Sequence, residues 1–125
     1  MSATILVVDD EPDVLFMTSF SLRSLGGFRI LEAHDGQEAY EVAVSEPPDA
    51  IVMDIKMPRM TGYEACRQIR ANPTTTHIPV ILLSAKGQKA EIEEGLAAGA
   101  TDYMLKPYAP VSLITRVKEL LGSAQ

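Results

Sequence analysis

Three acidic residues follow two strand-like segments of this sequence. Asp9 and Asp10 come directly after the apolar run 4–8, and Asp54 directly follows the apolar run 50–53. In open α/β sheets, ligands bind outside the carboxyl ends of the strands, where such acids would converge. Clustered carboxylates repel one another unless a cation holds them, and an oxygen-only site with few protein ligands suits Mg²⁺. The alternative is that Asp9 and Asp10 are solvated acids at the start of a helix.

A hydroxyl and an ammonium group are expected at the same edge of the sheet. Ser84 ends the strand-like run that begins at residue 80, and Lys106 ends the run that begins at residue 102. Lysine binds phosphate as a point charge, and a hydroxyl can donate a hydrogen bond to a phosphoryl oxygen. Either residue alone would most often be an ordinary surface residue. With the three acids, they predict a phosphate-sized pocket that carries both signs of charge.

Apolar strand-like runs alternate with amphipathic segments, which predicts βαβ units and a parallel sheet. We expect strands over residues 4–8, 28–33, 50–53, 80–83 and 102–105. We expect helices from residue 12 to about 25, over 36–45, 61–71 and 89–98, and over the final stretch that includes 113–121. Pro12 suits the first turn of the first helix, and Gly26 and Gly27 suit its end. The length predicts one domain, residues 1–125, with no second domain.

The composition excludes several classes of protein. Seventeen acidic and eleven basic residues give a formal net charge of −6, so direct binding to nucleic acid is not expected. No apolar run approaches the ~20 residues that span a bilayer, and the N-terminus lacks a signal-peptide pattern. Cys66 is the sole cysteine, which excludes an internal disulfide and fits a reducing compartment. We therefore expect a cytoplasmic protein that does not associate with membranes.

Four segments of the chain resemble the receiver domain of two-component response regulators. They are residues 5–11, 48–62, 79–85 and 99–107, and the resemblance covers nearly the whole chain. It implies a flavodoxin-like α/β fold, a doubly wound five-stranded parallel sheet of order 2-1-3-4-5 with five helices, as in single-domain chemotaxis regulators.

The resemblance also implies a role for each residue of the pocket. Asp54 would accept a phosphoryl group from a histidine kinase or a histidine phosphotransfer protein, and Lys106 and Ser84 would bind the phosphoryl oxygens. The chain would then be a phosphoacceptor that catalyses its own phosphorylation and dephosphorylation, and not a classical enzyme. The implied cofactor is Mg²⁺, with Mn²⁺ as the alternative ion, held by Asp9, Asp10, Asp54 and the backbone carbonyl of Lys56.

Four further residues have roles that the resemblance implies. Ser84 and Tyr103 would form a switch that alters a partner-binding face made by the fourth helix, the fifth strand and the fifth helix. The alternative for Tyr103 is a half-buried strand tyrosine. Lys56 and Lys86 lie two residues after Asp54 and Ser84, where this family tunes the dephosphorylation rate, although both could be solvated lysines. The Lys106–Pro107 peptide bond would be cis.

The sequence departs from the dimerising members of the family at Ser112. Receivers of DNA-binding regulators usually carry an acid there, although Asp102 and Arg116 match the rest of their charge network. We therefore expect a monomer, with a phosphorylation-dependent dimer as the alternative. Two other functions stay open: a receiver fragment of a longer regulator whose output domain is absent, and a phosphatase of the haloacid dehalogenase type with an acylphosphate intermediate. Lys56 speaks against the phosphatase, because those enzymes carry an acid at that position.

Overall fold

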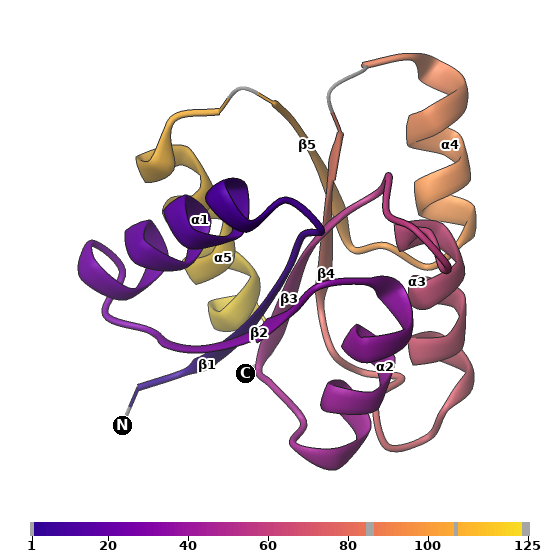
Figure 1. Cartoon of the computed structure of the whole chain (residues 1–125), viewed down its shortest axis with the longest axis horizontal. Coiled ribbons are helices and arrows are strands. Elements are labelled where there is room, and N and C mark those ends of the chain that lie inside the picture. The colour runs from indigo at the N-terminus through magenta and orange to yellow at the C-terminus, as the bar shows by residue number, and fades with distance from the viewer. Residues whose placement is uncertain (1, 85–86, 107, 124–125) are drawn as a thin grey trace.

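The computed structural model describes residues 2–84, 87–106 and 108–123, in which strands and helices alternate (Figure 1). The strands are β1 (Thr4–Val8), β2 (Arg29–Ala33), β3 (Ala50–Asp54), β4 (Val80–Ser84) and β5 (Asp102–Leu105). The helices are α1 (Pro12–Ser24), α2 (Gly36–Ser45), α3 (Gly62–Ala71), α4 (Lys89–Ala97) and α5 (Pro110–Ser123). Within the described residues, no helix combines the length and the hydropathy needed to cross a membrane.

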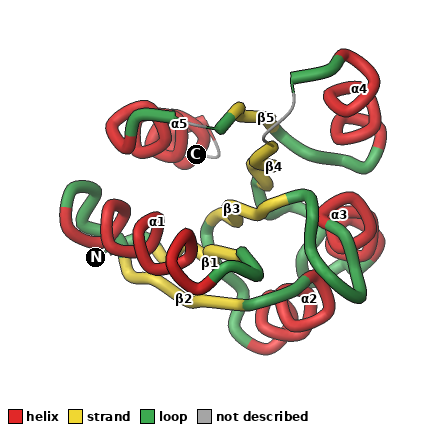
Figure 2. Tube along the Cα trace, turned by 45° about the horizontal axis from the view of Figure 1, so that its top comes forward, coloured by secondary structure: helices red, strands yellow, loops and turns green. Residues whose placement is uncertain are grey.

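The strands form one parallel sheet of order β2-β1-β3-β4-β5, which confirms the predicted fold. Figure 2 shows α1 and α5 on one side of the sheet and α2, α3 and α4 on the other. The chain moves outward from β1 to β2 and then returns to β3 on the opposite side of β1. The strand order therefore reverses between β1 and β3, and this switch point is where α/β sheets open a ligand-binding crevice.

Each face of the sheet has its own apolar core, because successive strand residues point to opposite faces. Leu6 and Val8 pack with α2 and α3, whereas Ile5 and Val7 pack with α1 and α5. These four side chains are almost completely buried, as expected for a parallel sheet that helices cover on both faces. The core thereby holds the carboxyl ends of the central strands in a fixed arrangement.

Strands β3 and β4 each run one residue further than the sequence predicts. The parallel ladder pairs Asp54 with Leu83 and Ser84 with Leu105, so both polar residues are strand residues. The sequence prediction stops before them because it follows apolar side chains, and both residues are polar. The strand itself continues because its hydrogen bonds are made by backbone groups. As a result Asp54 and Ser84 are buried, with relative exposures of 8% and 5%, and the strand backbone holds them in place.

The helix boundaries agree with the prediction to within a residue at most ends. Thr61 is the N-cap of α3 and not its first residue, and it forms a capping box with Glu64. In such a box the threonine hydroxyl accepts from the third helical amide, and the glutamate accepts from the backbone of the cap. Helix α4 ends at Ala97, one residue earlier than predicted.

Candidate functional site

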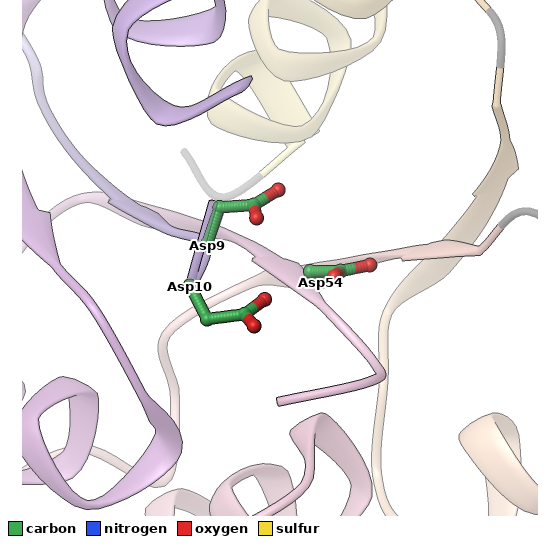
Figure 3. Close-up of side chains that lie close together, drawn as sticks. All are labelled: Asp9, Asp10 and Asp54. Atoms are coloured by element: carbon green, nitrogen blue, oxygen red, sulfur yellow. The ribbon is translucent and has the colours of Figure 1, made fainter. Parts of the chain in front are cut away.

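The three predicted acids converge at the carboxyl ends of β1 and β3. One carboxylate oxygen from each of Asp9, Asp10 and Asp54 lies within 4.8 Å of the other two (Figure 3). Asp9 and Asp54 are buried, and Asp10 is exposed. The cause is the strand register: Val8 pairs with Met53, so the residues that follow β1 lie beside the last residue of β3.

The geometry of this acid triad fits a hard divalent cation. Magnesium–oxygen distances of about 2.1 Å place opposite ligand atoms about 4.2 Å apart, so small side-chain movements would bring the three oxygens onto one ion. The exposure of Asp10 leaves room for the water ligands that Mg²⁺ retains. The residues present therefore fit the expected ion.

Lys106, which directly follows β5, brings a positive charge to two of these carboxylates. Its ammonium nitrogen lies 3.3 Å from Oδ2 of Asp9 and 3.3 Å from Oδ1 of Asp54. Burial by itself lowers the pKa of Lys106, but the charges of Asp54 and Asp9 outweigh burial, and the pKa is raised above its usual value. Lys106 therefore stays protonated in the pocket at neutral pH.

Asp54 has an electrostatic environment set by opposing effects. Burial raises the pKa of its carboxyl, Lys106 lowers it, and the charge of Asp9 raises it again, so that the pKa lies above its usual value. The Ile55 amide also donates a hydrogen bond that favours the charged form. The Asp54 carboxylate is thus only partly neutralised by the protein's own groups, and a cation beside it would complete the charge balance.

Ser84 and Lys106 line one small cavity with the acids. This cavity has a volume of about 290 Å³, and its lining includes Asp10, Asp54 and Lys56. The Lys56 residue is exposed at the edge of the cavity. Lys86 and the Lys106–Pro107 peptide bond, both singled out from the sequence, lie outside the described residues.

The hydroxyl of Ser84 has a partner that sequence reasoning missed. It donates a hydrogen bond to Oε1 of Glu91, at 3.2 Å, and the hydroxyl of Tyr103 donates to the same oxygen, at 3.4 Å. Glu91 lies in the first turn of α4, and no sequence motif connects it with Ser84. Only the packing of α4 against β4 and β5 brings the three side chains together.

The comparison with known families finds one match, which covers most of the chain. Residues 5–118 match the family model of the response regulator receiver domain. The chain belongs to this family. Receiver domains are phosphoacceptor modules that histidine kinases phosphorylate, and the acid triad of this receiver lies at the expected end of the sheet. The family assignment also favours the receiver over the phosphatase alternative.

Named relatives agree with the assignment. The receiver is 45% identical over 121 residues to the response regulator MprA of Mycobacterium ulcerans (strain Agy99), an alignment that covers 97% of this chain and 51% of MprA. The chain thus spans about half the length of the curated relatives that it matches. Among solved structures, chemotaxis protein CheY4 of Vibrio cholerae superposes with a TM-score of 0.90 at 31% identity, covering 96% of this chain and 99% of that one.

A second solved structure bears on the metal. The receiver domain of sensor histidine kinase PA1611 from Pseudomonas aeruginosa PAO1 has a TM-score of 0.90 at 34% identity, covering 98% of this chain and 99% of that one. It was crystallised with a magnesium ion coordinated in its active-site cleft. The acid triad of the present receiver is consistent with the same ion.

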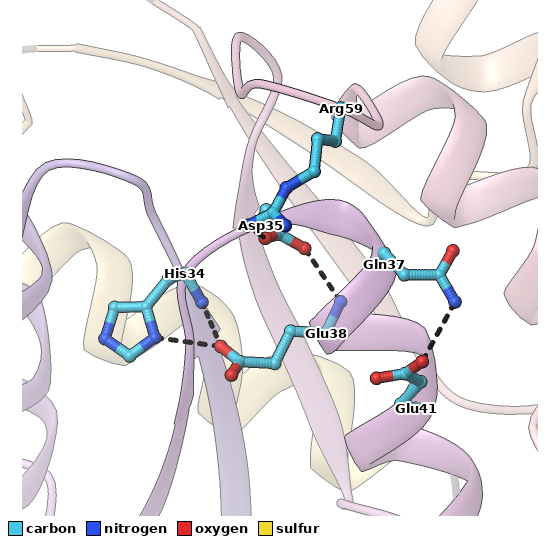
Figure 4. Close-up of polar contacts among 6 residues, drawn as sticks. All are labelled: His34, Asp35, Gln37, Glu38, Glu41 and Arg59. Atoms are coloured by element: carbon cyan, nitrogen blue, oxygen red, sulfur yellow. Dashed lines mark hydrogen bonds and ion pairs between the residues drawn. The ribbon is translucent and has the colours of Figure 1, made fainter.

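The loop after β3 is anchored to α2 by an ion pair. Arg59 has a left-handed backbone, with φ 67°, and its guanidinium lies 2.7 Å from the buried carboxylate of Asp35. Figure 4 shows Asp35 also accepting a hydrogen bond from the amide of Glu38, so that it caps α2. The loop that carries Lys56 is therefore tied to a fixed helix end.

Part of the charge network that dimerising receivers carry is present between β5 and α5. Arg116 of α5 forms an ion pair with Asp102 of β5, and it lies 3.3 Å from Glu119. Ser112 is exposed near the start of α5.

Proposed function

We propose that this receiver accepts a phosphoryl group on Asp54 from a phosphohistidine of a histidine kinase or histidine phosphotransfer protein. The observation that carries the proposal is the position of Asp54: it is the buried acid of the triad that lines the cavity with Ser84 and Lys106, and the Lys106 ammonium lies 3.3 Å from it. Asp9, Asp10, Asp54 and the backbone carbonyl of Lys56 would hold Mg²⁺, which supplies charge neutralisation at the phosphoryl oxygens.

The transfer needs only positioning and charge from the protein. An oxygen of the Asp54 carboxylate attacks phosphorus, the bond from phosphorus to the imidazole nitrogen breaks, and the nitrogen keeps the electron pair. Lys106 and Ser84 bind the phosphoryl oxygens, because both groups line the cavity with Asp54 and both can donate hydrogen bonds. The acylphosphate later loses its phosphoryl group to a water molecule, which regenerates the carboxylate and releases phosphate.

Lys56 is proposed to tune this second step. Its exposure at the edge of the cavity supports a role in controlling how water reaches the phosphoryl group. Lys86 is assigned the same role from its sequence position alone. The two lysines are therefore proposed to set the lifetime of the acylphosphate and not its formation.

An apolar face of α1 next to the pocket is proposed to receive the kinase. Phe16, Met17 and Phe20 have relative exposures of 62%, 61% and 51%, and exposed apolar clusters commonly mark interaction surfaces. Met17 lines a groove of about 740 Å³ that shares Val14 and Lys106 with the acid cavity. Met17→Asp should therefore reduce phosphotransfer from a kinase and leave labelling by acetyl phosphate unchanged.

The output face is proposed to be the surface made by α4, β5 and α5. Each element carries one exposed apolar side chain: Leu96 of α4, Leu105 of β5 and Val111 of α5 have relative exposures of 54%, 47% and 65%. Ser112 leaves the charge network of the dimerising receivers incomplete, which supports a monomer in the absence of phosphorylation. Residues 1–125 are proposed to act as one receiver domain.

A phosphotransfer screen against candidate histidine kinases tests the proposal. The expected result is rapid labelling by one or a few kinases in the presence of Mg²⁺, and no labelling when EDTA removes the ion. Leu96→Asp serves as the control for Met17→Asp, because it places an acid on the output face and should leave phosphotransfer intact. Labelling that is independent of divalent ions would contradict the proposed pocket.

A further inference from the structure

Glu91 contacts both residues of the proposed switch. Its Oε1 atom accepts hydrogen bonds from the hydroxyls of Ser84, at 3.2 Å, and Tyr103, at 3.4 Å. Burial raises the pKa of the Tyr103 phenol, and the neighbouring Ser84 hydroxyl opposes that shift. The three side chains form one cluster between α4 and the ends of β4 and β5.

The position of Glu91 is itself held by the surrounding structure. The hydroxyl of Tyr63 on α3 donates a hydrogen bond to the backbone carbonyl of Glu91, at 3.2 Å. One turn further on, Gly95 is buried, and a Cβ atom there would lie 3.3 Å from Leu82 and 3.7 Å from Tyr103. At Gly95 α4 therefore lies close against β4 and β5, and Glu91, one turn earlier, is held by its contact with Tyr63.

The hydroxyl of Ser84 cannot donate a hydrogen bond to Glu91 and to a phosphoryl group at the same time. A serine hydroxyl has a single proton, whereas a carboxylate and a phosphoryl oxygen both act as acceptors. Ser84 also lines the cavity with Asp54 and Lys106, so the same side chain adjoins both acceptors. Binding to phosphorylated Asp54 requires Ser84 to give up its hydrogen bond to Glu91.

We propose that Glu91 is a positioning residue that holds Ser84 and Tyr103 in the inactive arrangement and so sets the threshold for activation. This inference rests on the proposed function, since it assumes that Ser84 binds the phosphoryl group on Asp54. When the Ser84 hydroxyl donates its hydrogen bond to the phosphoryl group instead, Tyr103 keeps its hydrogen bond to Glu91. The cluster then has a second arrangement, in which Tyr103 still links β5 to Glu91 of α4 and Ser84 does not.

The test compares Glu91→Ala and Glu91→Gln with the wild type in titrations with beryllofluoride, which stands in for the phosphoryl group. The readout is the ¹H–¹⁵N NMR spectrum of the amides around Tyr103 at a fixed Mg²⁺ concentration, which also reports whether each variant is folded. A hydrogen bond to a charged acceptor is worth about tenfold or more in an equilibrium, and a neutral one less. Glu91→Ala should therefore lower the half-saturating concentration about tenfold, and Glu91→Gln, whose amide oxygen still accepts, about threefold.

Two controls separate the hydrogen bond from other effects. Glu93→Ala removes an acid of the same helix whose ion pair with Lys89 is long, 3.9 Å, and exposed, and it should stay within about twofold of the wild type. In a Ser84→Ala background, Glu91→Ala should cause little further change, because the two residues act through one contact.

The outcomes distinguish a failure of the role proposed for Glu91 from a failure of the proposed function. A wild type that does not respond to beryllofluoride at all would overturn the proposed function. A responsive wild type with an unchanged or higher half-saturating concentration for Glu91→Ala would overturn the role of Glu91. Equal effects of the Ala and Gln variants would also overturn it, because charge repulsion alone would then account for the change.

Discussion

The ammonium nitrogen of Lys106 lies 3.3 Å from Oδ1 of Asp54, although β4 separates the strand before Lys106 from the strand that ends in Asp54. The lysine side chain therefore reaches across one strand to balance a buried carboxylate. A phosphoryl group on Asp54 would meet this ammonium, which also lies 3.3 Å from Oδ2 of Asp9. Lys106 thus supplies part of the positive charge that a phosphoryl group requires, and a cation beside the acids would supply the rest.

Asp54→Asn should abolish phosphorylation. The amide cannot act as the nucleophile, whereas the fold should persist because asparagine has nearly the same shape. Acetyl phosphate with Mg²⁺ should add one phosphoryl group to the wild type and none to the variant, as read by intact-protein mass spectrometry. Asp13→Asn, an exposed acid in the first turn of α1, should be labelled like the wild type. Normal labelling of the Asp54 variant would contradict the assignment.

Asp10→Ala should weaken Mg²⁺ binding and leave the metal-free fold as stable as before, or more stable. Removing one of three clustered like charges relieves repulsion. The acid that contacts the start of α1 is Asp9, whose Oδ1 accepts a hydrogen bond from the amide of Glu11. Thermal melts in EDTA and in rising Mg²⁺ measure both effects. A large loss of stability in EDTA would instead mark Asp10 as a structural cap.

Ser84→Ala should still be phosphorylated but should shift only partly to the active state. A charge-assisted hydrogen bond contributes about 1.5–3 kcal/mol, so Lys106 and Ser84 together supply about 3–6 kcal/mol. Moving a two-state element from about 1:99 to 99:1 needs roughly 5.5 kcal/mol, so the loss of either contact leaves the shift incomplete. The measurement is NMR of the amides around Tyr103 at saturating beryllofluoride. A full wild-type shift would exclude Ser84 from the coupling.

Arg70→Ala should destabilise the fold by about 2–3 kcal/mol, because buried carbonyl groups would lose a charged donor. The guanidinium of Arg70 donates to the carbonyls of Gly99, at 2.8 Å, and Ile78, at 2.6 Å, and so connects α3 with the loops before β4 and β5. Urea denaturation measures the change. Arg67→Ala is the matched control, because its ion pair with Glu94 is long, 3.7 Å, and half exposed, and should be worth about 0.5 kcal/mol or less. Equal losses in both variants would refute the role given to Arg70.

The sequence by itself determined the fold class and the membership of the acid triad. Alternating apolar runs and amphipathic segments are local signals, and they predict parallel strands. Because the acids directly follow two of these strands, they must lie at the same edge of the sheet. The same reasoning placed Lys106 and Ser84 at that edge. The resemblance to receivers added the strand order, which local patterns do not contain.

The tertiary structure alone decided which groups these side chains contact. The extension of β3 and β4 through Asp54 and Ser84 depends on the backbone of the neighbouring strand, and an apolar pattern does not report that neighbour. The contact of Glu91 with Ser84 and Tyr103 depends on how closely α4 lies against β4 and β5. Hydrogen bonds require the two atoms to approach within about 3 Å, and only the packed core sets distances between separate elements with that accuracy.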